Sequence, residues 1–305
     1  MTDHQRYSSP AAAEAAIKST ARAAFTADPS LSIQERIRLE YFHRFLSRVF
    51  SEGTDSAWVL KGGTGMLARV ASARSTTDVD LFSRSRSHSL DSALDNLRRL
   101  ATIDLSDFFR FDYVGHTDAI GGDQQTYTEG YRATFEVYIG AKRKDHLHVD
   151  LVVNVVMTDD AEVATPANAL PLPKLASNPY LLYPVVDQIA DKVCATLALY
   201  SGRPSSREKD LVDLVVLAVT QDVGAAKLRR ALDAESGVRL PPLPSSFGVP
   251  TTWGPRYGRP AAAVPACDGF RTVAGATDLM RRFIDPVLDG SAADKRWSHI
   301  HLGWS

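Results

Sequence analysis

A glycine-rich turn near residue 60 has the composition of a phosphate-binding loop. It consists of Lys61, Gly62, Gly63 and Thr64, which follow a short apolar run and lead into a predicted helix over residues 64–70. Adjacent glycines let backbone amides approach a phosphate closely at the positive end of a helix dipole, and the Thr64 hydroxyl can add a hydrogen bond. The alternative interpretation is an ordinary glycine-rich connection.

A pair of aspartates follows on the next predicted strand, over residues 78–82. Asp78 and Asp80 are two positions apart, so their carboxylates point to the same face of that strand. Like charges this close repel unless divalent cations lie between them, and hard oxygen ligands suit Mg²⁺, which bridges to substrate phosphates. The turn and the aspartate pair together favour a phosphate-handling metal site. Asp150 on a later strand could complete a two-metal site for phosphoryl transfer, or could face solvent.

The strand that carries Asp150 also suggests a different metal site. His146, His148 and Asp150 share one strand face, and two imidazoles with a carboxylate can bind Zn²⁺ or Fe²⁺. A flat strand spreads these positions over about 13 Å at roughly 3.3 Å per residue, which disfavours convergence on one ion. We therefore expect these side chains to be polar groups on an exposed face of a sheet.

The second half of the chain places a lysine and two aspartates in predicted helices. Lys192 lies in an otherwise apolar helix over residues 185–200, and Asp210 and Asp213 lie one turn apart in the next helix, over 206–220. Lys192 could neutralise a triphosphate in a cleft between two domains. From the pattern alone, however, ordinary surface charges paired along a helix are favoured.

The elements that must position these residues alternate between strand and helix at first. A helix over residues 11–25 precedes a second one, which a capping-box motif at Ser32 and Glu35 begins. Ser89 can cap a further helix with a leucine stripe. Strands are predicted over 57–60, 78–82, 131–139 and 146–153, with a charged hairpin connection over 141–145.

The later part of the chain is mainly helical. A proline cluster over residues 165–185 marks a domain boundary, so we expect one domain over 1–175 and a mainly α-helical one over 176–305. Further helices are predicted over 224–235 and 270–288. The proline- and glycine-rich segment over 241–265 is predicted to be an irregular surface segment.

Composition excludes several classes of protein. With 305 residues, 44% of them hydrophobic and 23% charged, the chain suits one large or two ordinary domains. It has no apolar stretch long enough for a membrane span and no secretory signal, and Cys194 and Cys267 are too few for a disulfide framework, so we expect a cytoplasmic protein. The formal charge of −1 excludes a globally basic nucleic-acid binder but not a local basic patch.

Positive charge is weakly concentrated in the second part of the chain. Residues 201–305 carry 14 Lys and Arg against 11 Asp and Glu, whereas residues 1–200 carry 21 against 25. These basic groups could line an RNA-binding face or be solvated surface: Arg229, Arg230, Arg256, Arg259, Arg281, Arg282, Lys295 and Arg296.

These motifs, taken in order, resemble those of the AbiEii/AbiGii-type toxin nucleotidyltransferases, including the mycobacterial MenT-like toxins. The resemblance rests on the Gly-Gly-Thr turn, the D-x-D pair, Lys192 and the segment over 207–214, and it covers roughly residues 35–220. Thr64 stands where many members of the superfamily have Ser, which keeps the hydroxyl. The resemblance implies a polymerase-β-like α/β nucleotidyltransferase core, a mixed sheet with flanking helices, followed by a helical domain.

The resemblance also implies an activity and its residues. It implies Mg²⁺-dependent transfer of nucleotides from an NTP, CTP or UTP being the pyrimidine candidates, to the 3′ acceptor end of tRNA, which blocks aminoacylation. It further implies a toxin–antitoxin system with a cognate antitoxin protein. Asp78 and Asp80 would hold the metal, and Gly63 and Thr64 would cradle phosphate. Lys192 and Asp210, with Asp213 nearby, fall in the later active-site motifs and would serve nucleotide binding.

Two alternatives keep parts of this interpretation. One is a nucleotidyltransferase whose acceptor is a small molecule or a protein hydroxyl. The other is a binding protein that has the fold but no turnover, which the retained D-x-D pair argues against, because a decayed site has no reason to keep two carboxylates that repel.

Overall fold

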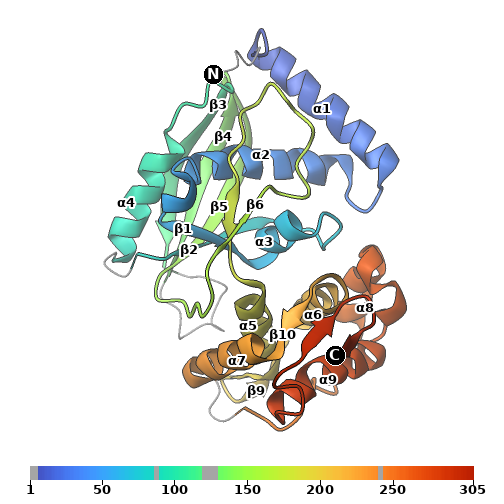
Figure 1. Ribbon diagram of the computed structural model, residues 1–305. Coiled ribbons are helices and arrows are strands. Elements are labelled where there is room, and N and C mark those ends of the chain that lie inside the picture. The colour runs from blue at the N-terminus through green and yellow to red at the C-terminus, as the bar shows by residue number, and fades with distance from the viewer. Residues whose placement is uncertain (1–5, 86–88, 119–129, 240–242) are drawn as a thin grey trace. The chain divides into compact units, whose positions relative to one another are not determined.

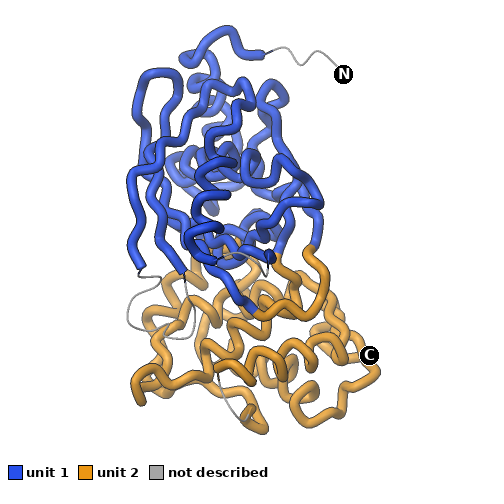
Figure 2. The backbone as a smooth tube through the Cα atoms, turned by 90° about the vertical axis from the view of Figure 1, so that its left-hand side faces the viewer, with its two compact units in different colours: residues 1–71, 75–155, 162–182 blue, residues 72–74, 156–161, 183–305 orange. Residues whose placement is uncertain are grey.

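The computed structural model describes residues 6–85, 89–118, 130–239 and 243–305. The chain forms two compact units, each with its own core, coloured separately in Figure 2. Unit 1 consists of residues 1–71, 75–155 and 162–182, and unit 2 of residues 72–74, 156–161 and 183–305.

Unit 1 is a seven-stranded mixed sheet with flanking helices (Figure 1). In spatial order its strands are β3 (Phe109–Thr117), β4 (Gly130–Ile139), β5 (Lys142–Val152), β2 (Asp78–Ser83), β1 (Trp58–Lys61), β7 (Tyr180–Leu182) and β6 (Glu162–Ala164). Strand β2 pairs in parallel with β5 and β1 in parallel with β7, while all the other pairs are antiparallel. The helices of this unit are α1 (Pro10–Ala27), α2 (Ile33–Val49), α3 (Gly62–Arg69) and α4 (Leu90–Ala101), with the short 3₁₀ helix η1 (Gly53–Asp55). The predicted α/β class is confirmed.

Alternation along the central strands decides which face of the sheet is covered. Val79 and Val149 are buried, and they alternate with the aspartates of β2 and β5. On the covered face, the Phe45 ring of α2 lies 5.3 Å from the ring of Phe111 and 5.1 Å from that of Phe135, and α4 packs on β3, β4 and β5. Because side chains alternate along a strand, the aspartates project from the opposite face.

The local signals for helix starts are confirmed. The Ser32 hydroxyl accepts from the backbone N–H of Glu35 at 3.2 Å, and the Glu35 carboxylate accepts from the N–H of Ser32 at 2.8 Å. Ser89 caps α4 in the same way, through the N–H of Ser92. These caps act within one turn, which explains why a short motif is enough to predict them.

Unit 2 is mainly helical. Its helices are α5 (Val185–Leu197), α6 (Glu208–Thr220), α7 (Ala225–Arg239), α8 (Pro255–Ala263) and α9 (Val273–Leu288), with the 3₁₀ helix η2 (Pro265–Phe270). Its short strands are β8 (Leu199–Tyr200), β9 (Arg203–Pro204), β10 (Val223–Gly224), β11 (Arg296–Ser298) and β12 (Gly303–Trp304). Helix α6 is buried over most of its length and packs against α5, α8 and α9, so it forms the centre of this unit.

Both cysteines, Cys194 and Cys267, are buried and free. Among the residues that the structure describes, no helix is long and apolar enough to cross a membrane.

Strand β3, which bulges between Tyr113 and Gly115, was not predicted, because the bulge interrupts its alternating pattern.

Two sequence predictions about connections are wrong in part. The charged segment over 141–145 is not a hairpin connection: β5 begins at Lys142, opposite Ile139, and the turn is made by Gly140 and Ala141, with Gly140 at φ +59°. The segment predicted to be irregular over 241–265 contains α8, in which Pro255 stands in the first turn, where a missing N–H costs nothing. Residues 241 and 242 of that prediction lie outside the described residues.

A buried ion pair joins α2 to the start of β3. Arg48 donates to both carboxylate oxygens of Asp107, at 2.9 and 2.6 Å, and to the Phe109 carbonyl at 3.0 Å. Both charged side chains are only 1% exposed. Removal of one partner would leave the other charge buried and unpaired, which is more costly than the loss of an exposed pair.

We predict that Asp107→Ala lowers the free energy of unfolding by about 3–5 kcal/mol. The control, Asp95→Ala, removes the exposed pair with Arg98 and should cost less than about 1 kcal/mol. Urea denaturation measures both, and hydrogen exchange in α2 locates the effect in unit 1. Equal losses in the two variants would contradict the prediction.

Candidate active site

Four charged residues occupy matching positions on four adjacent strands of unit 1. The register places Lys61 of β1 opposite Asp80 of β2, Asp80 opposite Asp150 of β5, and Asp150 opposite Arg132 of β4. Paired positions direct their side chains to the same face of a sheet. We call this set the charge row; its order is cation, carboxylate, carboxylate, cation.

Arg132 neutralises one end of the charge row. Its guanidinium makes a bidentate contact with Asp150, Nε to Oδ1 and Nη2 to Oδ2, both at 2.7 Å, and lies 3.5 Å from a carboxylate oxygen of Asp78. The hydrogen bonds to Asp150 and the nearby carboxylates raise the pKa of Arg132 above its ordinary value. Sequence reasoning missed Arg132, because only the pairing of β4 with β5 brings it to Asp150.

The glycine turn lies directly against Asp80 of the charge row. Gly62 has φ +60°, and a Cβ at this position would lie 2.0 Å from the Oδ2 atom of Asp80. A Cβ on Gly63 would lie 2.8 Å from the Thr76 hydroxyl oxygen. Only glycine adopts this backbone conformation freely and leaves this space, so the turn and the carboxylate are in direct contact.

Thr64 ties the same turn to the aspartate strand. Its hydroxyl donates to the main-chain carbonyl of Asp78 at 2.7 Å, and the residue is 4% exposed. The hydroxyl therefore fixes the start of α3 against β2. This places the backbone amides of the turn beside the two aspartates that the sequence singles out.

The donor set on β2 fits Mg²⁺. Asp78 and Asp80 offer hard oxygen ligands from one strand face, and Mg²⁺ is often held by one or two carboxylates with substrate phosphates completing its shell. In the described residues, no group of three or more His, Cys, Asp or Glu side chains is arranged to hold a metal. Asp150 is held by Arg132, and His148 shares a hydrogen bond with the Thr134 hydroxyl at 3.1 Å.

In unit 2, Lys192 joins two aspartates of α6. Its Nζ lies 3.1 Å from Oδ1 of Asp210 and 2.6 Å from Oδ2 of Asp213. The three side chains are 5%, 4% and 0% exposed, so the prediction of ordinary surface charges, drawn from the helix pattern alone, is wrong. Each aspartate also holds an arginine: Arg207 donates to Asp210, and Arg74 donates to Asp213 at 2.8 Å.

Mutual charge compensation shifts the pKa values in this cluster. Burial alone would lower the pKa of Lys192, but the carboxylates of Asp213 and Asp210 outweigh it and raise the pKa above its ordinary value. Burial likewise acts to raise the pKa of Asp210, and the charges of Lys192 and Arg207 outweigh it, lowering the pKa to about 2. Lys192 and Asp210 are therefore both ionised at neutral pH.

The mixed sheet, the glycine turn and the aspartate pair define an α/β nucleotidyltransferase fold. The family described as "Nucleotidyl transferase AbiEii toxin, Type IV TA system" matches residues 44–259. The chain therefore belongs to the AbiEii family of nucleotidyltransferase toxins of type IV toxin–antitoxin systems. Membership implies an NTP substrate and an antitoxin partner.

The chain is also similar to solved structures from Helicobacter pylori. One is JHP933, at 16% identity and a TM-score of 0.39, with 68% of this chain and 81% of that chain covered. Another is a candidate nucleotidyltransferase from H. pylori, also at 16% identity and a TM-score of 0.39, with 68% and 83% covered. No curated protein matches the chain significantly.

We predict that Gly62→Ala abolishes nucleotidyl transfer, because the added Cβ must displace the carboxylate of Asp80. The matched control is Gly53→Ala, which has nearly the same φ, +62°, but meets nothing within 4 Å. Both variants should lose about 1–2 kcal/mol of stability from the left-handed conformation. Only Gly62→Ala should lose transfer of label from an NTP, and equal activities in the two variants would contradict the prediction.

The lowered pKa of Asp210 predicts a dependence of stability on acid. A carboxylate whose folded pKa is depressed contributes stability that is present above its unfolded pKa near 4 and is lost as pH falls through its folded value of about 2. The stability difference between wild type and Asp210→Asn should therefore be constant above about pH 5 and shrink between about pH 4 and 2. Urea denaturation across this range measures it; a difference that does not change would refute the assignment.

Proposed function

We propose that this protein is the toxin of a type IV system that adds nucleotides, with CTP or UTP as donor, to the 3′ acceptor end of tRNA in the cytoplasm. The product cannot be aminoacylated, so translation stops until the cognate antitoxin intervenes. The observation that carries the proposal is the contact between Gly62 and the carboxylate of Asp80, inside a chain that belongs to a nucleotidyltransferase family.

The proposed reaction is an in-line displacement at the α-phosphorus of the NTP. The 3′ hydroxyl oxygen of the RNA forms the new bond to the α-phosphorus and gives up its proton to water. The bond between the α-phosphorus and the oxygen that bridges to the β-phosphate breaks, and pyrophosphate leaves with the bonding electrons. Asp78 and Asp80 would hold Mg²⁺, which would offset the negative charge that develops on the transferring phosphate. The backbone amides of the turn at Gly62 and Gly63 bind phosphate oxygens.

The remaining charged residues have supporting roles in this proposal. Lys61 and Arg132 limit the repulsion among the carboxylates of the charge row, so that the β2 aspartates can lie on one face of the sheet. In unit 2, Lys192 and Asp210 serve nucleotide binding, as the family motif implies. The burial of Lys192 between Asp210 and Asp213 supports a role in holding these groups in place.

We predict that purified protein, incubated with tRNA, Mg²⁺ and each α-labelled NTP in turn, transfers label from a pyrimidine nucleotide to the tRNA 3′ end. Asp80→Asn should reduce the rate by about 100-fold or more, because a metal ligand that offsets charge is worth several kcal/mol. The matched control is Asp112→Asn, which alters an exposed carboxylate of the same unit and should leave the rate unchanged. Chelation of the metal should stop the reaction, and added Mg²⁺ should restore it.

The destination of the label separates the alternatives. Label in a protein or a small molecule, with none in RNA, would support a different acceptor for the same chemistry. No transfer from any NTP, together with Asp80→Asn as toxic as wild type in cells, would reject the nucleotidyltransferase proposal altogether. Sequencing of tRNA 3′ ends after induction identifies the species modified and the number of nucleotides added.

A further inference from the structure

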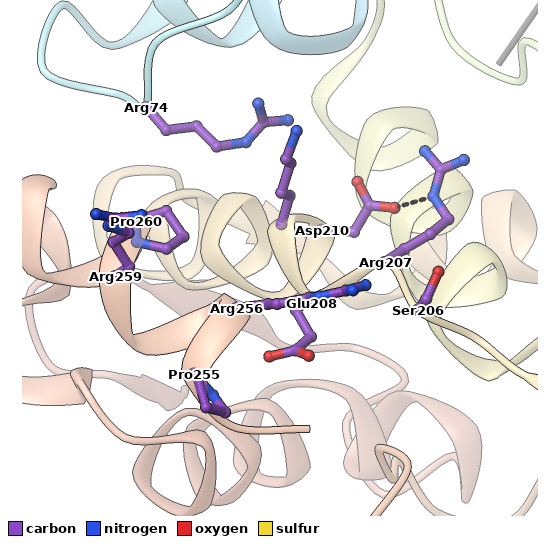
Figure 3. Close-up of a pocket in the computed structure, with 10 residues that line it drawn as sticks. Arg74, Ser206, Arg207, Glu208, Asp210, Pro255, Arg256, Arg259 and Pro260 are labelled. Atoms are coloured by element: carbon purple, nitrogen blue, oxygen red, sulfur yellow. Dashed lines mark hydrogen bonds and ion pairs between the residues drawn. The ribbon is translucent and has the colours of Figure 1, made fainter. Parts of the chain in front are cut away.

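Unit 2 contains a large pocket, and of its lining residues the proposed reaction so far uses only Asp210. It has a volume of about 1020 Å³ and is shown in Figure 3. Its walls come from three segments of unit 2: Arg74, residues 206–210 before and at the start of α6, and α8 through Pro255, Arg256, Arg259 and Pro260. The volume lies at the upper end of the range for small-molecule sites, about 300–1,000 Å³, which leaves space for more than one nucleotide.

The lining of this pocket is strongly basic. Its cations are Arg74, Arg207, Lys209, Arg256 and Arg259, and its acids are Glu208 and Asp210. Both acids already have partners within the protein: Glu208 accepts from the backbone N–H of Gly254 at 3.0 Å, and Asp210 is paired with Lys192 and Arg207. The pocket therefore offers a surplus of positive charge to a ligand.

Three of the cations make no salt bridge with the described residues. Lys209, Arg256 and Arg259 are absent from the ion pairs found there, whereas Arg74 and Arg207 are fixed by the aspartates of α6. Arg256 and Arg259 lie one turn apart on α8, and Figure 3 shows them on the pocket wall with Pro260. The pocket thus combines fixed and unengaged cations.

Two helix starts add to this positive potential. The pocket is lined by the first turns of α6 and α8, and in the described part of the chain neither helix has a side-chain hydrogen bond at its N-cap. Backbone N–H groups at a helix start carry a partial positive charge. Together with the five cations, they suit an extended anion.

The arrangement fits a strand of nucleic acid better than a single phosphate group. The cations come from three separate segments, so they can follow successive phosphates along a backbone. Guanidinium planes also stack on unpaired bases, and the proline rings with the aliphatic stems of the arginines provide apolar walls. An isolated anion would need the charges to converge on one point.

We infer that this pocket binds the single-stranded 3′ segment of the acceptor RNA, with Arg256 and Arg259 contacting its phosphates. The inference rests on the proposed function for the choice of RNA as acceptor. The inference also sorts the basic residues that the sequence suggests for an RNA-binding face into two groups. Arg256 and Arg259 belong to the binding site, whereas Arg282 and Lys295 are exposed elsewhere on unit 2 and do not line the pocket.

The test measures binding of a 5′-fluorescein RNA of about eight nucleotides to the full chain, without NTP, over a range of salt concentrations. The variant Arg256→Glu with Arg259→Glu should raise the Kd at least about 10-fold. It should also reduce the slope of log Kd against log salt by about 1.4, since each phosphate contact to a single strand contributes about 0.7. The charge-matched control, Arg282→Glu with Lys295→Glu, should bind like wild type.

Three further measurements separate loss of the RNA site from unfolding and from loss of a nucleotide site. Arg256→Gln with Arg259→Gln should give an intermediate loss, and circular dichroism should show that all variants are folded. Equilibrium dialysis with a labelled NTP should give the wild-type Kd for the variant Arg256→Glu with Arg259→Glu. A variant that loses NTP binding but keeps RNA binding would place Arg256 and Arg259 in a nucleotide site and would overturn the inference.

The remaining outcomes are equally decisive. RNA binding by the α8 variant at the wild-type level, an equal loss in the control, or no RNA binding by wild type would each reject the inference. If wild type binds RNA through these arginines but transfers no nucleotide, the proposed function fails while the inference stands. If the variant Arg256→Glu with Arg259→Glu transfers nucleotides normally at low RNA concentration, the inference fails while the proposed function stands.

Discussion

Repulsion between carboxylates on neighbouring strands is the constraint around which unit 1 is arranged. Asp80 and Asp150 occupy paired positions on β2 and β5, where two like charges repel each other unless cations lie nearby. Arg132 meets this need at Asp150 with a bidentate contact, and Lys61 stands at the other end of the row. The two carboxylates of β2 lie beside a turn whose amides suit phosphate. The register of four strands therefore decides which charged residues lie side by side at the candidate site.

In unit 2, carboxylates that would also repel each other are buried and are compensated by a buried lysine. Asp210 and Asp213 lie on the central helix α6 with almost no exposure, and buried charges without partners are strongly destabilising. Lys192 binds both, and the same two carboxylates orient Arg207 and Arg74. Those two arginines line the basic pocket, so the buried lysine and its two aspartates help to position part of the pocket wall. The motif that resembles an active-site signature is also a structural anchor of its unit.

Local signals predicted much of the fold. The capping box at Ser32, the cap at Ser89 and the alternation of β4 depend on neighbours in sequence, so short motifs carry them. Two failures have different local signals behind them: a bulge interrupts the alternation of β3, whereas α8 begins inside a proline-rich segment that gives no helical periodicity. At both places, packing within the unit determines the backbone conformation more strongly than local propensity does.

The sequence by itself determined the chemical types at the site: a glycine turn, an i, i+2 aspartate pair, and a later lysine with two aspartates, which together point to nucleotidyl transfer. Only the tertiary structure decided how these groups are partnered. It assigned Arg132 to Asp150, buried Lys192, and separated Arg256 and Arg259 from the other surface arginines. The physical reason is that charge compensation acts over a few ångströms in space, whereas the residues that compensate one another are up to 139 positions apart along the chain, as Arg74 and Asp213 are.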